Sequence, residues 1–146
     1  MEKRDMNLLN RIYQNAQIGM LSVDKVIKKT KDDSMKKLLK KQFDLYSKCA
    51  DKCMGIAMSD NLEISGNNFF TKFRQTTMIY LSLWTNNTLR HIVEMMIQGT
   101  LMGIIDTIKA KKDYPTDRED INNLVVEFMK LQEDFFEKLK KLLAKV

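Results

Sequence analysis

Two pairs of residues in this sequence have types and spacings that could do chemistry. His91 is the only histidine, and Glu94 follows three residues later, so both side chains would lie on one side of a helix. Cys49 and Cys53 are four residues apart and would also share a helical face. Imidazole, carboxylate and thiolate are the groups that bind transition metals in proteins. The first question is therefore whether either pair belongs to a metal or redox site.

Neither pair has obvious partners. No further Cys or His could complete a site with the two cysteines, so we interpret them as buried thiols in a reducing compartment. His91, Glu94 and Gln98 form one polar stripe, which we interpret as solvated; a surface metal site completed by a second subunit is the alternative. We expect no cofactor and no stoichiometric iron or manganese.

Other enzyme signatures are missing from the sequence. The five glycines are scattered singly, so there is no glycine-rich phosphate loop. A serine or cysteine nucleophile needs a nearby base, and no carboxylate partner is implied for the one histidine. The residues favour a protein that is not an enzyme.

The positive charge is concentrated in one segment, KVIKKTKDDSMKKLLKK, which spans residues 25–41. Its eight lysines and two aspartates account for the whole net charge of +6. The anion-binding candidates are Lys28, Lys29, Lys36, Lys37, Lys40 and Lys41. No arginine or aromatic residue is interleaved with them to grip phosphate or stack on bases. The segment is either a solvated surface or a weak, sequence-independent site for nucleic acid or an anionic membrane surface.

The composition is typical of one all-helical domain. The chain has 146 residues, one proline and 44% hydrophobic residues, with apolar positions recurring every three to four residues. The spacing predicts helices over 2–29, 33–58, 86–112 and 117–145, and a 59–84 connection containing a short helix. Capping residues are expected at Asp32, Asp33 or Ser34, within Thr85–Thr88, and at Thr116 or Asp117.

Four long helices with two short turns predict a four-helix bundle. The 59–84 connection is long enough to cross the bundle, although an up-down-up-down order with the extra segment beside it is the alternative. The first residues have no apolar core for a signal peptide, and no run approaches the ~20 apolar residues of a membrane span. We therefore expect a cytoplasmic protein.

The stretch HIVEMMIQGTLMGIID, residues 91–106, is best explained by packing. Gly99 and Gly103 share one side of the helix, where another backbone could approach closely. Met96, Met102 and their apolar neighbours point in nearly every direction, which predicts burial on several sides. Either the bundle covers them within one chain, or a homodimer forms through this helix and the 68–84 segment.

Part of the sequence resembles a known superfamily. The stretch MIQGTLMGIIDTIKAKKDYP, followed by a helix that ends in LQEDFFEKLKKLL, looks like uncharacterised bacterial members of the ferritin-like superfamily. The resemblance covers the whole chain as architecture and is specific in the last two expected helices. Active members hold two iron or manganese ions with a Glu from each of two helices and a Glu-x-x-His motif from each of the others.

This sequence departs from that pattern at every metal position. The residue three before His91 is Thr88, so the chain contains no Glu-x-x-His. The expected seams carry Ala16, Gly19, Phe43, Tyr46, Phe128 and Phe135, with only Gln17, Gln42 and Gln132 as polar residues near them. Amides are poor ligands for these metals. The resemblance therefore implies a bundle without the di-metal site, acting as a structural or interaction protein; the alternatives are an atypical metal or redox site at His91 and Glu94, or anion binding through the lysines.

Overall fold

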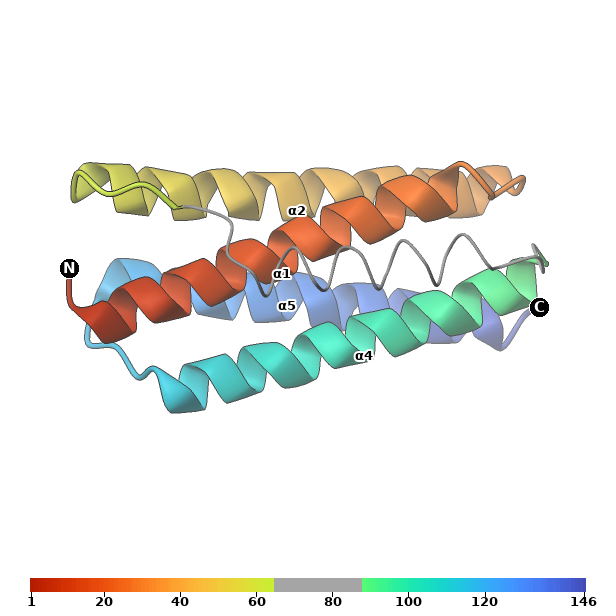
Figure 1. Cartoon of the computed structure of the whole chain (residues 1–146). Coiled ribbons are helices and arrows are strands. Elements are labelled where there is room, and N and C mark those ends of the chain that lie inside the picture. Colours follow the sequence, from red (N-terminus) through yellow and green to blue (C-terminus); the bar gives the residue numbers. More distant parts are fainter. Residues whose placement is uncertain (65–87) are drawn as a thin grey trace.

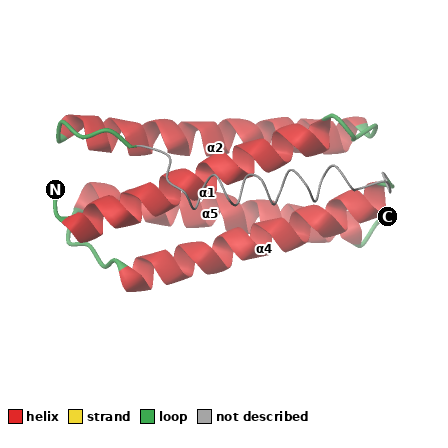
Figure 2. Cartoon of the chain, viewed as in Figure 1, coloured by secondary structure: helices red, strands yellow, loops and turns green. Residues whose placement is uncertain are grey.

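The computed structural model describes residues 1–64 and 88–146, which form an all-α four-helix bundle (Figure 1). The helices are α1 (Lys3–Ile27), α2 (Asp33–Ser59), α4 (Leu89–Asp113) and α5 (Glu119–Leu143). Figure 2 shows only helices, turns and loops, and no strand occurs in the described residues. The expected four-helix architecture is confirmed. Among the helix bounds, the largest difference between expectation and structure is the start of α4, which is Leu89 rather than residue 86. The short helix expected within 59–84 falls mostly outside the described residues.

Two of the expected caps explain where helices begin. The carboxylate of Asp32 accepts a hydrogen bond of 2.8 Å from the backbone N–H of Met35, and α2 starts at the next residue. The hydroxyl of Thr88 accepts from the N–H of His91 at 3.3 Å and caps α4. Each cap satisfies an amide that has no partner within its helix.

The start of α5 differs from the prediction. Its N-cap residue is Arg118, without a side-chain cap, whereas Thr116 or Asp117 was expected to cap it. The hydroxyl of Thr116 instead accepts from the N–H of Arg118 at 3.1 Å, outside the helix. The Arg118 guanidinium reaches across the bundle and pairs with Asp60, beyond the end of α2, at 2.7 Å.

The Asp60–Arg118 pair also shows how the helices run. It brings the end of α2 to the turn before α5, so α2 ends at the opposite end of the bundle from the start of α4 (Figure 1). α1 and α5 run in one direction and α2 and α4 in the other (Figure 1). This arrangement does not fit the up-down-up-down alternative. The link between α2 and α4 lies largely outside the described residues.

Each helix packs against two main neighbours. α1 lies between α2 and α4, and α5 lies beside the same two helices at the opposite corner. The buried apolar stripes of all four helices meet in one core, whose largest fully buried members include Phe128, Phe135, Leu8, Leu9, Ile12, Met35, Leu39, Ile92, Ile121 and Leu139. One side of α4 remains outside this core.

The ion pairs of Arg118 should make the bundle sensitive to acid. Its hydrogen bonds hold the pKa values of Asp60 and Asp120 below their ordinary value of 3.8. A carboxyl group with a lowered folded-state pKa stabilises the fold above its unfolded-state pKa, and this contribution is lost as pH falls through the folded-state pKa. We expect Arg118→Gln to unfold at a lower temperature than the natural protein at pH 6. The gap should close below about pH 4.

Thermal unfolding followed by circular dichroism between pH 2 and pH 7 would measure that gap. Arg90→Gln is the matched control, because the ion pair of Arg90 within the described residues is a local one, with Glu94 of the same helix at 3.3 Å. A gap between Arg118→Gln and the natural protein that stays constant across the whole pH range would contradict the prediction.

Candidate interaction surfaces

His91 and Glu94 lie in the first two turns of α4, on the side away from the core. Both are half-buried, and Gln98 beyond them is exposed. The Glu94 carboxylate pairs with Arg90 at 3.3 Å. Among residues 1–64 and 88–146, no three His, Cys, Asp or Glu side chains are placed to hold a metal ion. A metal site using these two residues would need ligands from elsewhere.

The two cysteines are buried on α2. Cys53 has no exposed surface and Cys49 is only 2% exposed. The hydrogen bond that the Cys53 thiol makes to the neighbouring Cys49 sulfur, together with burial, raises the pKa of Cys53 well above its ordinary range. The thiolate is the reactive form of cysteine, and this environment suppresses it. The geometry favours two packed thiols over a nucleophile.

The centre of the bundle contains apolar and amide side chains. Ala16, Tyr46 and Phe128 are buried there, and burial raises the pKa of Tyr46 to about 12. The side chain of Gln42 donates to the carbonyl of Leu131 at 3.4 Å. These groups bond and pack with neighbouring helices, so their environment is that of a core.

The two glycines of α4 have different surroundings. A Cβ atom at Gly103 would lie 2.7 Å from Nε2 of Gln132, so the absence of a side chain there leaves room for the Gln132 side chain of α5. The Thr107 hydroxyl, 2.8 Å from the Gly103 carbonyl, lies 3.0 Å from Oε1 of the same glutamine. At Gly99, by contrast, no described atom would lie within 4 Å of a Cβ. A side chain of α5 therefore lies close to Gly103, no described atom lies close to Gly99, and the approach of another backbone to these glycines stays a prediction.

The methionines of this stretch divide in the same way. Met96 is buried in the core, whereas Met102 is 59% exposed. Met102 belongs to an exposed apolar group on α4 that we call the α4 outer face. Its members are Leu101 (43% exposed), Met102 (59%), Ile105 (44%) and Ile108 (55%). Burial of this helix on all sides is not found within the described chain.

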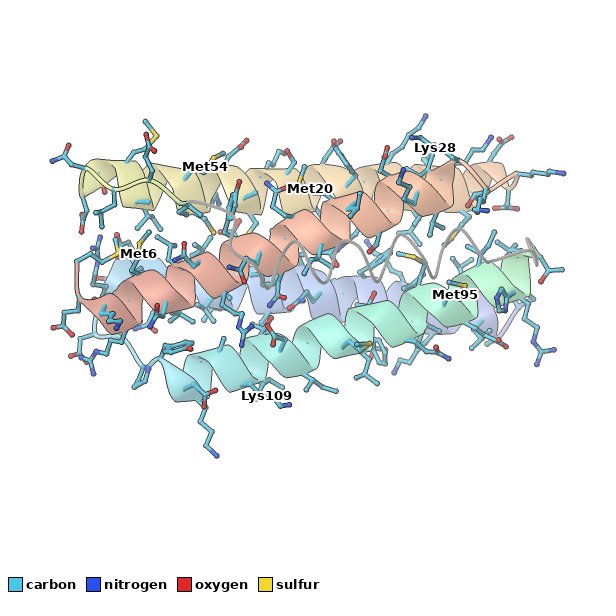
Figure 3. All side chains as sticks on the ribbon, in the orientation of Figure 1. Met6, Met20, Lys28, Met54, Met95 and Lys109 are labelled. Carbon is cyan, nitrogen blue, oxygen red and sulfur yellow. The ribbon has the colours of Figure 1, made fainter. Side chains whose placement is uncertain are left out.

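The α4 outer face lies opposite the side that packs on α1 and α5. The buried residues Val93, Met96 and Thr100 mark the inward side of the same helix. Figure 3 shows Lys109, near the end of the outer face, on the side of α4 turned away from the other helices. Contiguous exposed apolar side chains are unusual on monomers and mark interaction sites.

The lysines of residues 25–41 lie at the end of the bundle where α1 turns into α2, and Figure 3 shows Lys28 there. Figure 1 places the C-terminus and the start of α4 at the same end. The fold therefore adds five basic residues that sequence reasoning missed: Arg90, Lys138, Lys140, Lys141 and Lys145. Three ion pairs offset part of this charge: Asp24–Lys28 (3.4 Å), Glu94–Arg90 (3.3 Å) and Glu137–Lys140 (2.9 Å). We call this region the basic end.

A shallow cleft of about 390 Å³ lies between α2 and α5. Gly55 opens it, because no described atom would lie within 4 Å of a Cβ there. Lys52 and Glu127 face each other across it at 2.6 Å. Lys52 and Glu127 neutralise each other, and both are half-exposed to water. The cleft therefore resembles an ordinary groove between two helices more than a catalytic site.

No family model matches the chain, and comparisons with curated proteins and with solved structures find no significant match. None of the four described helices is long and apolar enough to cross a bilayer. The α4 outer face and the basic end are therefore the two features from which a function can be argued.

Proposed function

We propose that this chain is a ferritin-like bundle without a di-metal site, and that it acts as an interaction protein through the α4 outer face. The observation that carries the proposal is the placement of Leu101, Met102, Ile105 and Ile108 in water, opposite the core. Association would remove this apolar surface from water, at about 25 cal/mol for each Å² buried. A homodimer in the cytoplasm is the simplest form of this association.

The direction of the helices supports the ferritin-like part of the proposal. A bundle with one long crossover has its second and third long helices running in the same direction, as α2 and α4 do (Figure 1). The same order occurs in unrelated bundles, so architecture alone assigns no activity. The interaction role rests on the surface of α4.

Polar substitution of the α4 outer face should abolish association and leave the fold intact. In the variant Leu101→Gln/Ile105→Gln, two half-exposed apolar side chains become amides, and the core contacts of α4 are untouched. We expect the natural protein to sediment above monomer mass at high concentration and the variant to sediment as a monomer. Their helical circular dichroism should be the same.

The control is Val126→Gln on α5, because Val126 is 61% exposed and equally apolar. This substitution should leave association unchanged. Equal masses for the natural protein and the Leu101→Gln/Ile105→Gln variant, at every concentration, would remove the basis for the proposed function.

Anion binding at the basic end is a second candidate function. It is favoured because the fold gathers lysines from α5 and residues 25–41, which are far apart in sequence, at one end of the bundle. A local excess of one charge attracts polyanions before contact and weakly holds them afterwards. Binding of this kind would be independent of sequence and would weaken as salt rises.

Removing lysines from either segment should weaken binding to duplex DNA, RNA or anionic vesicles. The first variant changes Lys28, Lys29, Lys36 and Lys37 to Gln, and the second changes Lys138, Lys140 and Lys141 to Gln. Each lost phosphate contact should reduce the slope of log affinity against log salt by roughly 1. A variant with Lys3, Lys109 and Lys111 changed to Gln removes charge away from this end and should bind normally. Equal loss in all three variants would show that net charge alone matters.

The alternative of a metal or redox protein at His91 and Glu94 is addressed by elemental analysis of protein purified without added metal. One equivalent of iron or manganese that is lost in His91→Ala would favour it over the interaction role.

A further inference from the structure

We propose that α4 pairs with α4 of a second copy of this chain, antiparallel, so that Glu94 of each copy lies opposite Lys112 of the other. This inference rests on the proposed function and names the partner of the α4 outer face.

The spacing of exposed residues on α4 is that of a helix-pairing seam. One set of outward positions recurs at alternating intervals of four and three residues: Glu94, Gln98, Leu101, Ile105, Ile108 and Lys112. An average interval of 3.5 residues keeps one stripe facing a partner helix over several turns. The centre of the stripe is apolar and both ends are polar, as in an interface with a dry core and a polar rim.

The charges at the two ends determine the direction of pairing. Glu94 is half-exposed at the N-terminal end of the seam, and Lys112 is exposed at the C-terminal end. Parallel pairing would oppose Glu94 to Glu94 and Lys112 to Lys112, which repel. Antiparallel pairing places Glu94 of each copy opposite Lys112 of the other. It also places the positive N-terminal end of each helix dipole beside the negative C-terminal end of the other.

One register satisfies the whole seam. When Leu101 lies opposite Ile105 of the second copy, Gln98 lies opposite Ile108, and Glu94 opposite Lys112, because all three pairs are centred on the same point of the helix. Met102, the most exposed apolar residue of α4, lies beside that centre and would meet Met102 of the second copy. The surface is thus complementary to itself.

Self-complementarity of this kind is what a two-fold symmetric interface requires. The acidic and basic ends lie at equal distances from the apolar centre, about 13 Å along the helix at 1.5 Å per residue. Binding of a different protein does not require the charged ends of α4 to be placed symmetrically about its apolar centre. The observation therefore points to a second copy rather than to another protein.

Charge reversal tests the register. In Glu94→Lys, and separately in Lys112→Glu, both ion pairs of the dimer become like-charge pairs. Each substitution should raise the dimer dissociation constant roughly tenfold in low salt. The double variant Glu94→Lys/Lys112→Glu restores opposite charges and should recover the affinity of the natural protein. Sedimentation equilibrium measures all four dissociation constants.

Lys48→Glu, an exposed charge reversal on α2, is the control and should leave the dissociation constant unchanged. The Arg90–Glu94 pair within α4 is lost in Glu94→Lys, so unfolding curves should confirm that each variant folds.

Disulfide trapping supplies an independent readout. Both natural cysteines are buried, so Glu94→Cys and Lys112→Cys each introduce the exposed thiol. Antiparallel pairing predicts that mixed variants form the 94–112 disulfide and that each variant alone cross-links poorly.

Failure of the inference differs from failure of the proposed function. The antiparallel register is wrong if the double charge variant does not recover affinity, or if each cysteine variant cross-links to itself. If Leu101→Gln/Ile105→Gln still abolishes association in that case, the proposed interaction role of the α4 outer face stands. If the natural protein is a monomer throughout, the second copy is wrong as partner, and the self-association on which the proposed function is tested fails with it.

Discussion

Phe128→Ala should lower the free energy of unfolding by about 3–5 kcal/mol, the largest effect expected from any single substitution considered for this bundle. Phe128 has no exposed surface and lies near the centre of the core. Its ring packs at a tilt against Tyr46, with 6.1 Å between the ring centroids. Alanine would lose the ring's burial and leave a cavity that helices α2 and α5 cannot close by small shifts. Urea unfolding measured by circular dichroism gives the difference.

Phe136→Ala on the same helix is the matched control. Phe136 is half-buried, and its ring lies under the ammonium of Lys140 at 5.2 Å from the centroid. The same chemical change at this position removes less buried surface and leaves no enclosed cavity, so we expect a loss of about 1 kcal/mol or less. Equal losses for both variants would mean that the Phe128 site is not a tightly packed centre.

Gly19→Ala is expected to destabilise the protein by about 1–3 kcal/mol, although alanine is the better helix former. A Cβ atom at Gly19 would lie only 2.6–2.8 Å from three ring carbons of Tyr46. Tyr46 is itself buried between α1 and the core, so the ring cannot swing into water. Relief would require α1 and α2 to separate along their whole contact, and this outweighs the gain in helix propensity.

Gly55→Ala makes the same substitution where no described atom lies within 4 Å. It should stabilise the protein by up to about 1 kcal/mol, because only the helix propensity changes. A double-mutant cycle of Gly19→Ala with Tyr46→Leu separates the clash from propensity, since the smaller side chain leaves room for the new methyl group. If Gly19→Ala alone stabilised the protein, the Tyr46 ring would not restrict the size of the side chain at position 19.

The α4 outer face and the buried side of α4 both carry apolar residues but have opposite environments. Met96 and Met102 lie close together in the sequence, and one is buried while the other is exposed. Side chains on the outer face bury less surface within one chain than core side chains do, so their replacement by glutamine separates association from folding. This makes α4 the most informative helix for experiments.

The sequence by itself determined the helices and most of their ends. Apolar residues recurring every three to four positions predict four amphipathic helices, and this signal is local. The short segments that contain the caps Asp32 and Thr88 were identifiable for the same reason, since a cap bonds to an amide three residues away. The start of α5 could not be read in this way. Arg118 occupies the cap position there, and its guanidinium pairs with Asp60, which is 58 residues away in the sequence.

Only the tertiary structure decided that one side of α4 stays uncovered. The helical spacing places Val93 toward the core, but α4 is apolar nearly all round, so the spacing could not indicate that Leu101 and Ile105 face water rather than a neighbouring segment. Gly99 and Gly103 were equivalent in sequence, and the position of Gln132 on α5 made them different.

The basic end is also a product of the fold. The lysine excess in residues 25–41 is visible in the sequence, but the lysines near the end of α5 join it only because α1 and α5 run in the same direction. The physical reason is common to all these cases. Helix formation depends on residues within one or two turns, whereas burial, close approach and surface charge depend on which distant segments become neighbours.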